Sequence, residues 1–408
     1  MKKFFHWVAL ALLLFALQEA LFRAVFPIPE VENFNRVTYS GVPPPGKTSS
    51  FLGNLAPAMH ATFRWNSLPD GATFESHLNL YGFRDRDWNI RPTRGKERVM
   101  FVGDSLVEGF MATDEETISR GYGRAAVEHG ESVEAMNFGL GGTGVDAYCN
   151  LLRDAVPLFR PRRIVVVFYA NDFPHPPLPP IHAVPTLTPI FANTLLPRIV
   201  PIARRIRHHQ ALPRRWHAHA TMFVPIVPDP LSPWTNAPPE YSQVDPAIAE
   251  AMRKGDFNPF VVDLLNQVQQ NLRQPIDPSA TLQQLQEAAR SAQAELRIVY
   301  LPFAVQVSDY YIPFQQKYAL QKGINSGIPS LLGPGYQIHS QALAKSCQEL
   351  GLPFLDLTPL LRKAEAGGGH LYWNFDEHMR GSAYLRVGAT INQWVHSTET
   401  IETLASLN

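Results

Sequence analysis

Short apolar runs rich in β-branched and aromatic residues recur along the chain, each bounded by glycine or polar residues. They lie at residues 98–103, 133–138, 164–168, 297–301 and 353–356. Between them, apolar positions recur at helical spacing, in residues 117–129, 144–156, 246–295, 337–350 and 382–395. Short continuous apolar runs are typical of strands buried on both faces of a parallel sheet. The alternation predicts a three-layer α/β/α fold with a flavodoxin-like parallel sheet of about five strands.

The N-terminus carries a different pattern. Lys2 and Lys3 precede a mostly apolar stretch, residues 4–26, in which Glu19 and Arg23 are the charged residues. A positive end before an apolar stretch is the export pattern, and this stretch is long enough to span a bilayer. Its small residues are poorly spaced for cleavage, which favours an uncleaved signal anchor over a cleaved signal peptide or a buried core helix. The rest of the chain is then expected outside the cytoplasm.

Proline divides the remainder of the chain. Residues 27–95 are expected to form a linker and then, from about residue 58, a lead-in of irregular or short-strand structure; residues 96–400 are expected to form one domain. This domain is interrupted by an insertion, residues 174–240, which holds 16 of the 36 prolines. Such a density predicts that no regular core element lies in the insertion.

Basic and histidine side chains gather inside this insertion. Three interpretations stay open, namely a solvated surface, contact with anionic lipid headgroups, and binding of an acidic polysaccharide. A metal site at His217 and His219 is the weakest alternative. The side chains concerned are Arg204, Arg205, Arg207, His208, His209, Arg214, Arg215, His217 and His219.

Composition narrows the class of protein. With 36 basic and 36 acidic side chains the formal charge is zero, so nothing favours a nucleic-acid partner. Aromatic residues at 11% argue against disorder. The two cysteines, Cys149 and Cys347, are too few for a disulfide framework or a four-cysteine zinc site. We expect two free, buried thiols.

Polar residues that could carry chemistry follow the predicted strands. Ser105 ends the first strand in a Gly-Asp-Ser turn, Gly142 lies in a glycine-rich loop, and Asn171 follows the third strand. Asp376 and His378 precede the last helix. In parallel sheets, ligand sites collect beyond the carboxyl ends of the strands. Taken singly, each is as well explained by a helix cap, a turn or a surface histidine.

Asp104 and Gln306 are also polar residues that follow predicted strands. Asp104 is adjacent to the serine, and we expect it to cap the following helix rather than act as an acid. Gln306, just after the fourth strand, either lines the site or is a solvated loop residue.

Taken together and in this order, the four loops resemble the four blocks of the SGNH (GDSL-type) hydrolases, which carry Ser, Gly, Asn and His. Ser105, Gly142, Asn171 and His378 stand in the matching positions, and Asp376 precedes the histidine. One residue separates this pair, as in a subset of the family. The resemblance covers roughly residues 95–172 and 295–395. The segment of residues 81–85 is also similar to the lead-in of membrane-anchored bacterial members.

The resemblance implies a serine esterase in a bacterial inner membrane, with its catalytic domain periplasmic or extracellular. Ser105, His378 and Asp376 would form the triad, and Ser105, Gly142 and Asn171 the oxyanion hole. No metal or organic cofactor is expected. The substrate would be an O-acyl ester, with acetyl on an envelope glycan favoured; lipid esters and thioesters stay open. The alternatives are an O-acyltransferase with the same triad and a catalytically silent, membrane-tethered binding protein.

Overall fold

The structure is a computed structural model. It describes residues 2–25, 60–65, 70–79, 81–90, 92–173, 221–224, 244–254, 257, 261, 265, 268, 270–317 and 330–396. The predicted linker after the N-terminal helix and most of the insertion lie outside these residues. The cluster of arginines and histidines at residues 204–219 does so too.

A five-stranded parallel sheet forms the centre of the fold, as the apolar runs predict. The strands lie in the order β4-β3-β5-β7-β8. Numbered within this sheet alone, the order is 2-1-3-4-5, which is the flavodoxin-like order. The strands are β3 (Glu97–Gly103), β4 (Val133–Gly139), β5 (Arg163–Phe168), β7 (Glu295–Tyr300) and β8 (Phe354–Asp356).

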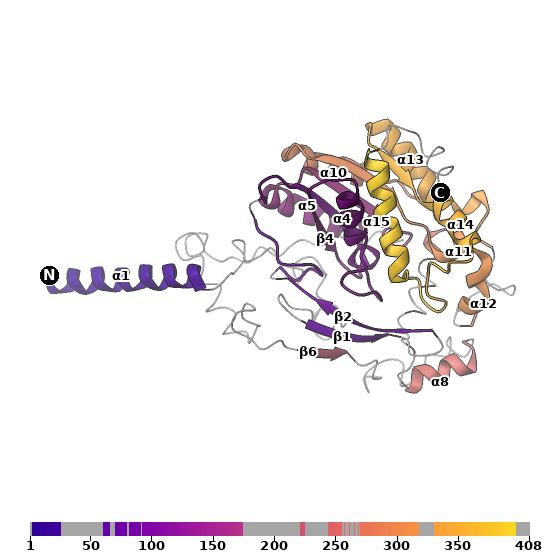
Figure 1. Cartoon of the computed structure of the whole chain (residues 1–408), viewed down its shortest axis with the longest axis horizontal. Helices are drawn as coiled ribbons and strands as arrows, with labels where there is room; N and C mark the ends of the chain where they lie inside the picture. The colour runs from indigo at the N-terminus through magenta and orange to yellow at the C-terminus, as the bar shows by residue number, and fades with distance from the viewer. Residues whose placement is uncertain are drawn as a thin grey trace.

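Helices cover both faces of this sheet and complete the three layers (Figure 1). Successive strand residues enter opposite cores; Phe101 of β3, for example, packs on one face and Val102 on the other. One face is covered by α4 (Ile118–Glu128), α11 (Ala304–Val307), α14 (Thr358–Ala366) and α15 (Gly381–His396). The other is covered by α5 (Val145–Phe159), α10 (Ser279–Ser291) and α13 (Ile338–Leu350).

Several helices depart from the expected boundaries. Residues 246–295 are expected to be helical; among the described residues they include α8 (Pro246–Lys254) and α10, and Glu295 already starts β7. The short helix α11 and helix α14 were not predicted. The other short elements that follow the insertion in sequence are η3 (Asp309–Tyr311), α12 (Ile312–Gln315) and η4 (Pro334–Tyr336).

A second, three-stranded sheet lies in the order β2-β1-β6; two of its strands fall in the lead-in, where short strands or irregular structure are expected, and its third strand is unexpected. It pairs β1 (His60–Trp65) with β2 (Ala72–His77) in antiparallel fashion and with β6 (Thr221–Val224) in parallel. Strand β6 belongs to the proline-rich insertion, so the expectation of an insertion without regular core structure needs correction. Residues 221–224 are free of proline and consist of strand-forming residues, which allows a short strand there.

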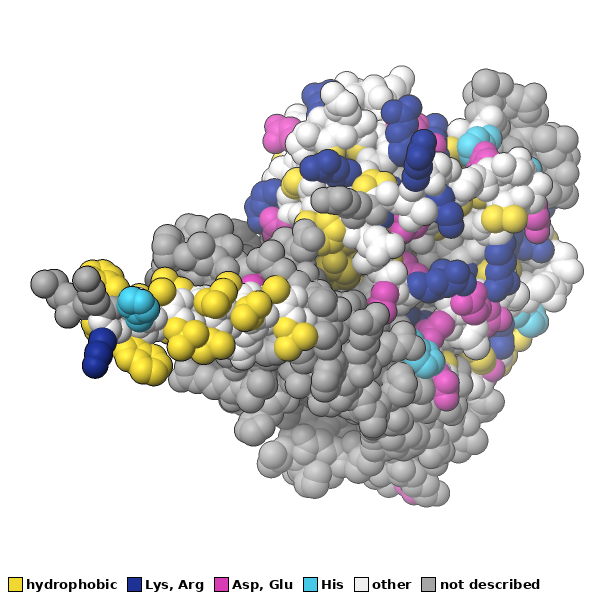
Figure 2. Space-filling model, turned by 60° about the vertical axis from the view of Figure 1, so that its left-hand side comes forward, with side chains coloured by type: hydrophobic (Ala, Val, Ile, Leu, Met, Phe, Trp, Pro, Cys, Tyr) yellow, Lys and Arg dark blue, Asp and Glu magenta, His cyan; other side chains and the backbone are white. Residues whose placement is uncertain are grey.

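Helix α1 (Lys2–Val25) carries the apolar N-terminal stretch. Residues Lys3–Leu21 are long and apolar enough to cross a membrane, a test that signal sequences near the N-terminus also pass. Its large apolar side chains, among them Phe4 and Trp7, are exposed along the helix (Figure 2). The i,i+4 spacing of Glu19 and Arg23 would allow an ion pair, but the Arg23 side chain lies outside the described ones.

The two cysteines are free thiols, as expected. Cys347 is buried, whereas Cys149 is half-buried. Burial raises the pKa of each thiol to about 12, so both stay protonated at neutral pH.

Candidate active site

Ser105 lies where β3 ends at the carboxyl edge of the sheet. It opens α3 (Ser105–Glu108), and the Asp104 carboxylate caps this helix by accepting the Leu106 N–H at 2.8 Å. The capping role expected for Asp104 is therefore what the geometry provides. The helix after Ser105 has a single turn, so few peptide dipoles align behind the serine.

The structure brings Ser105 into contact with the predicted histidine. The Ser105 hydroxyl lies 2.8 Å from His378 Nε2, although 273 residues separate the two in sequence. Asp376 Oδ1 contacts His378 Nδ1 and also accepts the His378 backbone N–H at 2.9 Å. With the imidazole proton on Nδ1, facing the carboxylate, Nε2 is free to accept the serine proton.

A short hairpin holds the histidine in place. Tyr372 and Met379 form an isolated antiparallel bridge, and the Trp373 N–H donates to the His378 carbonyl at 3.0 Å. On the other side the Phe110 ring packs on the imidazole, with centroids 4.9 Å apart. His378 is only 3% exposed, so its ring has little freedom to leave the serine.

The other two predicted residues reach the same edge from neighbouring loops. Gly142 lies in the loop after β4, and Asn171 in the loop after β5. These loops are tied together, because the Val145 N–H donates to the Asp172 carbonyl at 3.3 Å. Asn171 Oδ1 is buried without a hydrogen-bond partner, which leaves this amide poorly satisfied by the protein alone.

The resemblance implies that the Asn171 amide donates to the oxyanion. On that role, replacing Asn171 with alanine is expected to lower kcat by about 10²–10³-fold, because one donor would be lost. Steady-state hydrolysis of a chromogenic acetyl ester measures this effect. KM should change little, since the ground-state carbonyl carries less charge than the oxyanion. A kcat within a factor of about two of wild type would remove Asn171 from the oxyanion hole.

Buried carboxyl groups surround the triad. Burial raises the pKa of Asp104 to about 6, and it raises the pKa of Asp172 and of Glu377 well above the usual values. Asp172 is the best satisfied, since it accepts the Tyr148 hydroxyl at 2.5 Å and the Tyr169 N–H at 2.7 Å. Both carboxyl oxygens of Glu377 lack a hydrogen-bond partner.

Replacing Glu377 with glutamine is expected to stabilise the protein more at pH 8 than at pH 5. Because its folded pKa is raised, the folded chain keeps this proton where the unfolded chain, with a pKa near 4.5, has lost it. Wild-type stability therefore falls as pH rises above the unfolded pKa, with a slope of up to about 1.4 kcal/mol per unit. Thermal unfolding at pH 5 and pH 8 tests this prediction, with the exposed-site variant Glu128→Gln as the control. If Glu377→Gln changed the stability equally at the two pH values, the prediction would be wrong.

Sequence reasoning missed two residues and misplaced one. Asp172 and Glu108 both bind backbone or side-chain groups of the site loops, yet an Asn-Asp turn and a lone glutamate in a short helix are weak signals. Gln306 neither lines the site nor is solvated. It is buried within α11, where its side chain accepts the Phe303 N–H at 2.8 Å and donates to the Tyr336 carbonyl at 2.6 Å.

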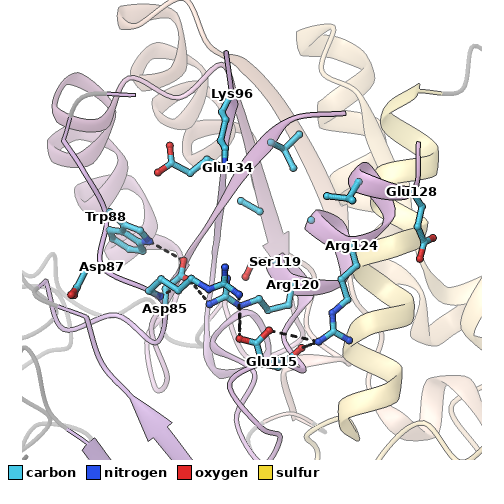
Figure 3. Close-up of a pocket in the computed structure, with 15 residues that line it drawn as sticks. Asp85, Asp87, Trp88, Lys96, Glu115, Ser119, Arg120, Arg124, Glu128 and Glu134 are labelled. Atoms are coloured by element: carbon cyan, nitrogen blue, oxygen red, sulfur yellow. Dashed lines mark hydrogen bonds and ion pairs between the residues drawn. The ribbon is translucent and has the colours of Figure 1, made fainter. Parts of the chain in front are cut away.

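A separate pocket of about 640 Å³ lies among the described residues, away from the serine. It is bounded by the segment after β2, by α4 and by the start of β4 (Figure 3). A chain of ion pairs crosses it: Arg120 binds Asp85 at 3.0 Å and Glu115 at 3.8 Å, and Arg124 also binds Glu115. Its arginines are thus largely neutralised by neighbouring carboxylates. Among the described residues, no group of three or more His, Cys, Asp or Glu side chains is placed to hold a metal ion.

No family model matches the chain, and no curated protein matches it. Among solved structures, TesA is 12% identical, covering 73% of this chain and 97% of that chain at a TM-score of 0.34. A psychrotrophic esterase, EstA from Pseudoalteromonas sp., is 9% identical, with 74% and 100% covered and a TM-score of 0.34. A putative acylhydrolase from Bacteroides fragilis is 12% identical, with 75% and 88% covered and a TM-score of 0.31.

Likenesses this distant carry no argument about the chemistry of this chain. The fold and the contacts themselves define the class of protein. It is a three-layer α/β protein in which a histidine contacts both a serine and an aspartate at the carboxyl edge of the sheet.

Proposed function

We propose that this protein is a serine esterase of the SGNH type. The observation that carries the proposal is the 2.8 Å contact between the Ser105 hydroxyl and His378 Nε2, with Asp376 on the opposite ring nitrogen. A hydroxyl activated by an oriented imidazole is the arrangement that nucleophilic acyl chemistry requires.

In the proposed reaction, Ser105 Oγ attacks the carbonyl carbon of an ester while His378 Nε2 takes its proton. The oxyanion is stabilised by the backbone N–H groups of Ser105 and Gly142 and by the side-chain amide of Asn171. His378 then returns the proton to the leaving alcohol, and an acyl group remains on Ser105. Water, activated by the same imidazole, releases the acyl group as a carboxylic acid. Asp376 holds the ring in the productive tautomer and stabilises the imidazolium.

For the substrate, we propose an O-acyl ester, acetyl above all, on a glycan or lipid of the cell envelope. Helix α1 supports this proposal, because its length and composition fit a membrane anchor. An anchored enzyme meets substrates at the membrane surface, and we place the catalytic domain on its periplasmic or extracellular side.

A fluorophosphonate probe tests the nucleophile on the full chain. We expect a single covalent adduct, which peptide mapping locates at Ser105. Failure to label any residue would favour a silent binding protein. A panel of acetyl and longer acyl esters, assayed with and without added sugar, then compares release of free acid with transfer to a hydroxyl; predominant transfer would replace hydrolysis as the activity.

A further inference from the structure

Glu108 lies on the same helical turn as the proposed nucleophile and reaches the neighbouring loop. It is the last residue of α3 and is only 3% exposed. Its Oε2 accepts the backbone N–H of Gly141 at 2.8 Å. A buried glutamate therefore bonds directly to the residue that precedes Gly142, a proposed oxyanion donor.

The backbone of α3 also packs closely on the start of this loop. The Asn137 side chain accepts the Gly139 N–H at 2.9 Å and donates to the Glu108 carbonyl at 3.4 Å. A Cβ atom added at Gly139 would fall 2.0 Å from the Glu108 nitrogen, so glycine is needed for this close approach. The one-turn helix and the loop thus form one packed unit.

The loop itself has little intrinsic order. Glycine occupies positions 141, 142 and 144, and Gly142 has a left-handed φ of +73°. Only the two backbone torsions of Gly141 separate the N–H bound by Glu108 from the N–H of Gly142. Both torsions are unusually free in glycine, so an external anchor is required to fix the second N–H.

We propose that Glu108 is a positioning residue, which fixes the Gly142 N–H relative to Ser105 so that both can donate to one oxyanion. This inference rests on the proposed esterase function. It assigns Glu108 no contact with the substrate and no proton transfer.

Replacing Glu108 with alanine tests the inference. We expect kcat for acetyl-ester hydrolysis to fall by about 10–10²-fold with little change in KM, because a displaced donor weakens binding of the transition state alone. The affinity for a boronic acid, which forms a tetrahedral adduct with Ser105, should fall by a similar factor. Glu108→Gln keeps an acceptor oxygen, so its kcat and its affinity for the boronic acid should both lie within about fivefold of the wild-type values.

Several outcomes would overturn the inference. These are a wild-type kcat in Glu108→Ala, or a lower kcat with unchanged boronate affinity. If Glu108→Ala fails to fold, Glu108→Asp can replace it, because it withdraws the carboxylate by one methylene. It should lower both kcat and the affinity for the boronic acid, and wild-type values of both would contradict the inference. Exposed Glu128→Ala serves as the control. Activity that survives in Ser105→Ala would defeat the proposed function instead, so the two failures can be told apart.

Discussion

Replacing Ser105 with alanine is expected to lower kcat for ester hydrolysis by a factor on the order of 10⁴–10⁶, to the limit of detection. The substitution removes the proposed nucleophilic oxygen, and no other hydroxyl is bound to His378 Nε2 among the described residues. Because the change deletes one oxygen from a half-buried site, the fold should persist. Turnover of a chromogenic acetyl ester, measured with thermal unfolding of the same preparation, provides the test.

Ser132→Ala is a suitable control for this experiment. Ser132 is exposed and precedes β4, so it lies at the amino edge of the sheet, opposite the site. It should leave turnover unchanged. If Ser105→Ala retained more than about a hundredth of wild-type kcat while Ser132→Ala remained normal, Ser105 would not be the nucleophile.

Replacing Asp376 with asparagine is expected to lower kcat by about 10⁴-fold at neutral pH. An asparagine amide can donate a hydrogen bond to His378 Nδ1, which favours the tautomer with its proton on Nε2. That nitrogen then cannot accept the proton of Ser105. Steady-state kinetics with the same ester measures the loss, and fluorophosphonate labelling should slow in parallel because both need the activated serine.

The adjacent carboxyl provides a matched control for Asp376. Glu377→Gln makes the same acid-to-amide change one residue away, where both oxygens lack a hydrogen-bond partner. Burial raises the pKa of Glu377 well above its usual value, and its oxygens orient no part of the imidazole, so kcat should change little. If the two variants lost activity equally, the orienting role would not belong to Asp376 alone.

The central sheet was predictable because its signal is local. Buried parallel strands are continuous apolar runs, and all five strands of the central sheet are where these runs lie. The pairing of strands in the small sheet was not predictable from the sequence. Strands β1 and β6 lie more than 150 residues apart, and they pair through backbone groups that leave no pattern in either segment.

The site residues were predictable to different degrees. Ser105, Gly142 and Asn171 follow three adjacent strands, so the parallel topology alone places them near one another. Gln306 follows a fourth strand and satisfied the same rule, yet it is buried as a helix cap. Position at a strand end is thus insufficient to assign a residue to the site, because the direction of its side chain depends on its local hydrogen bonds.

The sequence by itself determined the α/β class, the parallel central sheet and the loops on which the candidate chemistry lies, since each follows from hydrophobic periodicity and residue type. Only the tertiary structure decided that Ser105 meets His378, that Glu108 anchors Gly141, and that Glu377 is buried without partners. The physical reason is that burial and contact depend on residues far away in the chain. A carboxylate in water and one in the core are the same letter in a sequence, yet their pKa values and hydrogen bonds differ.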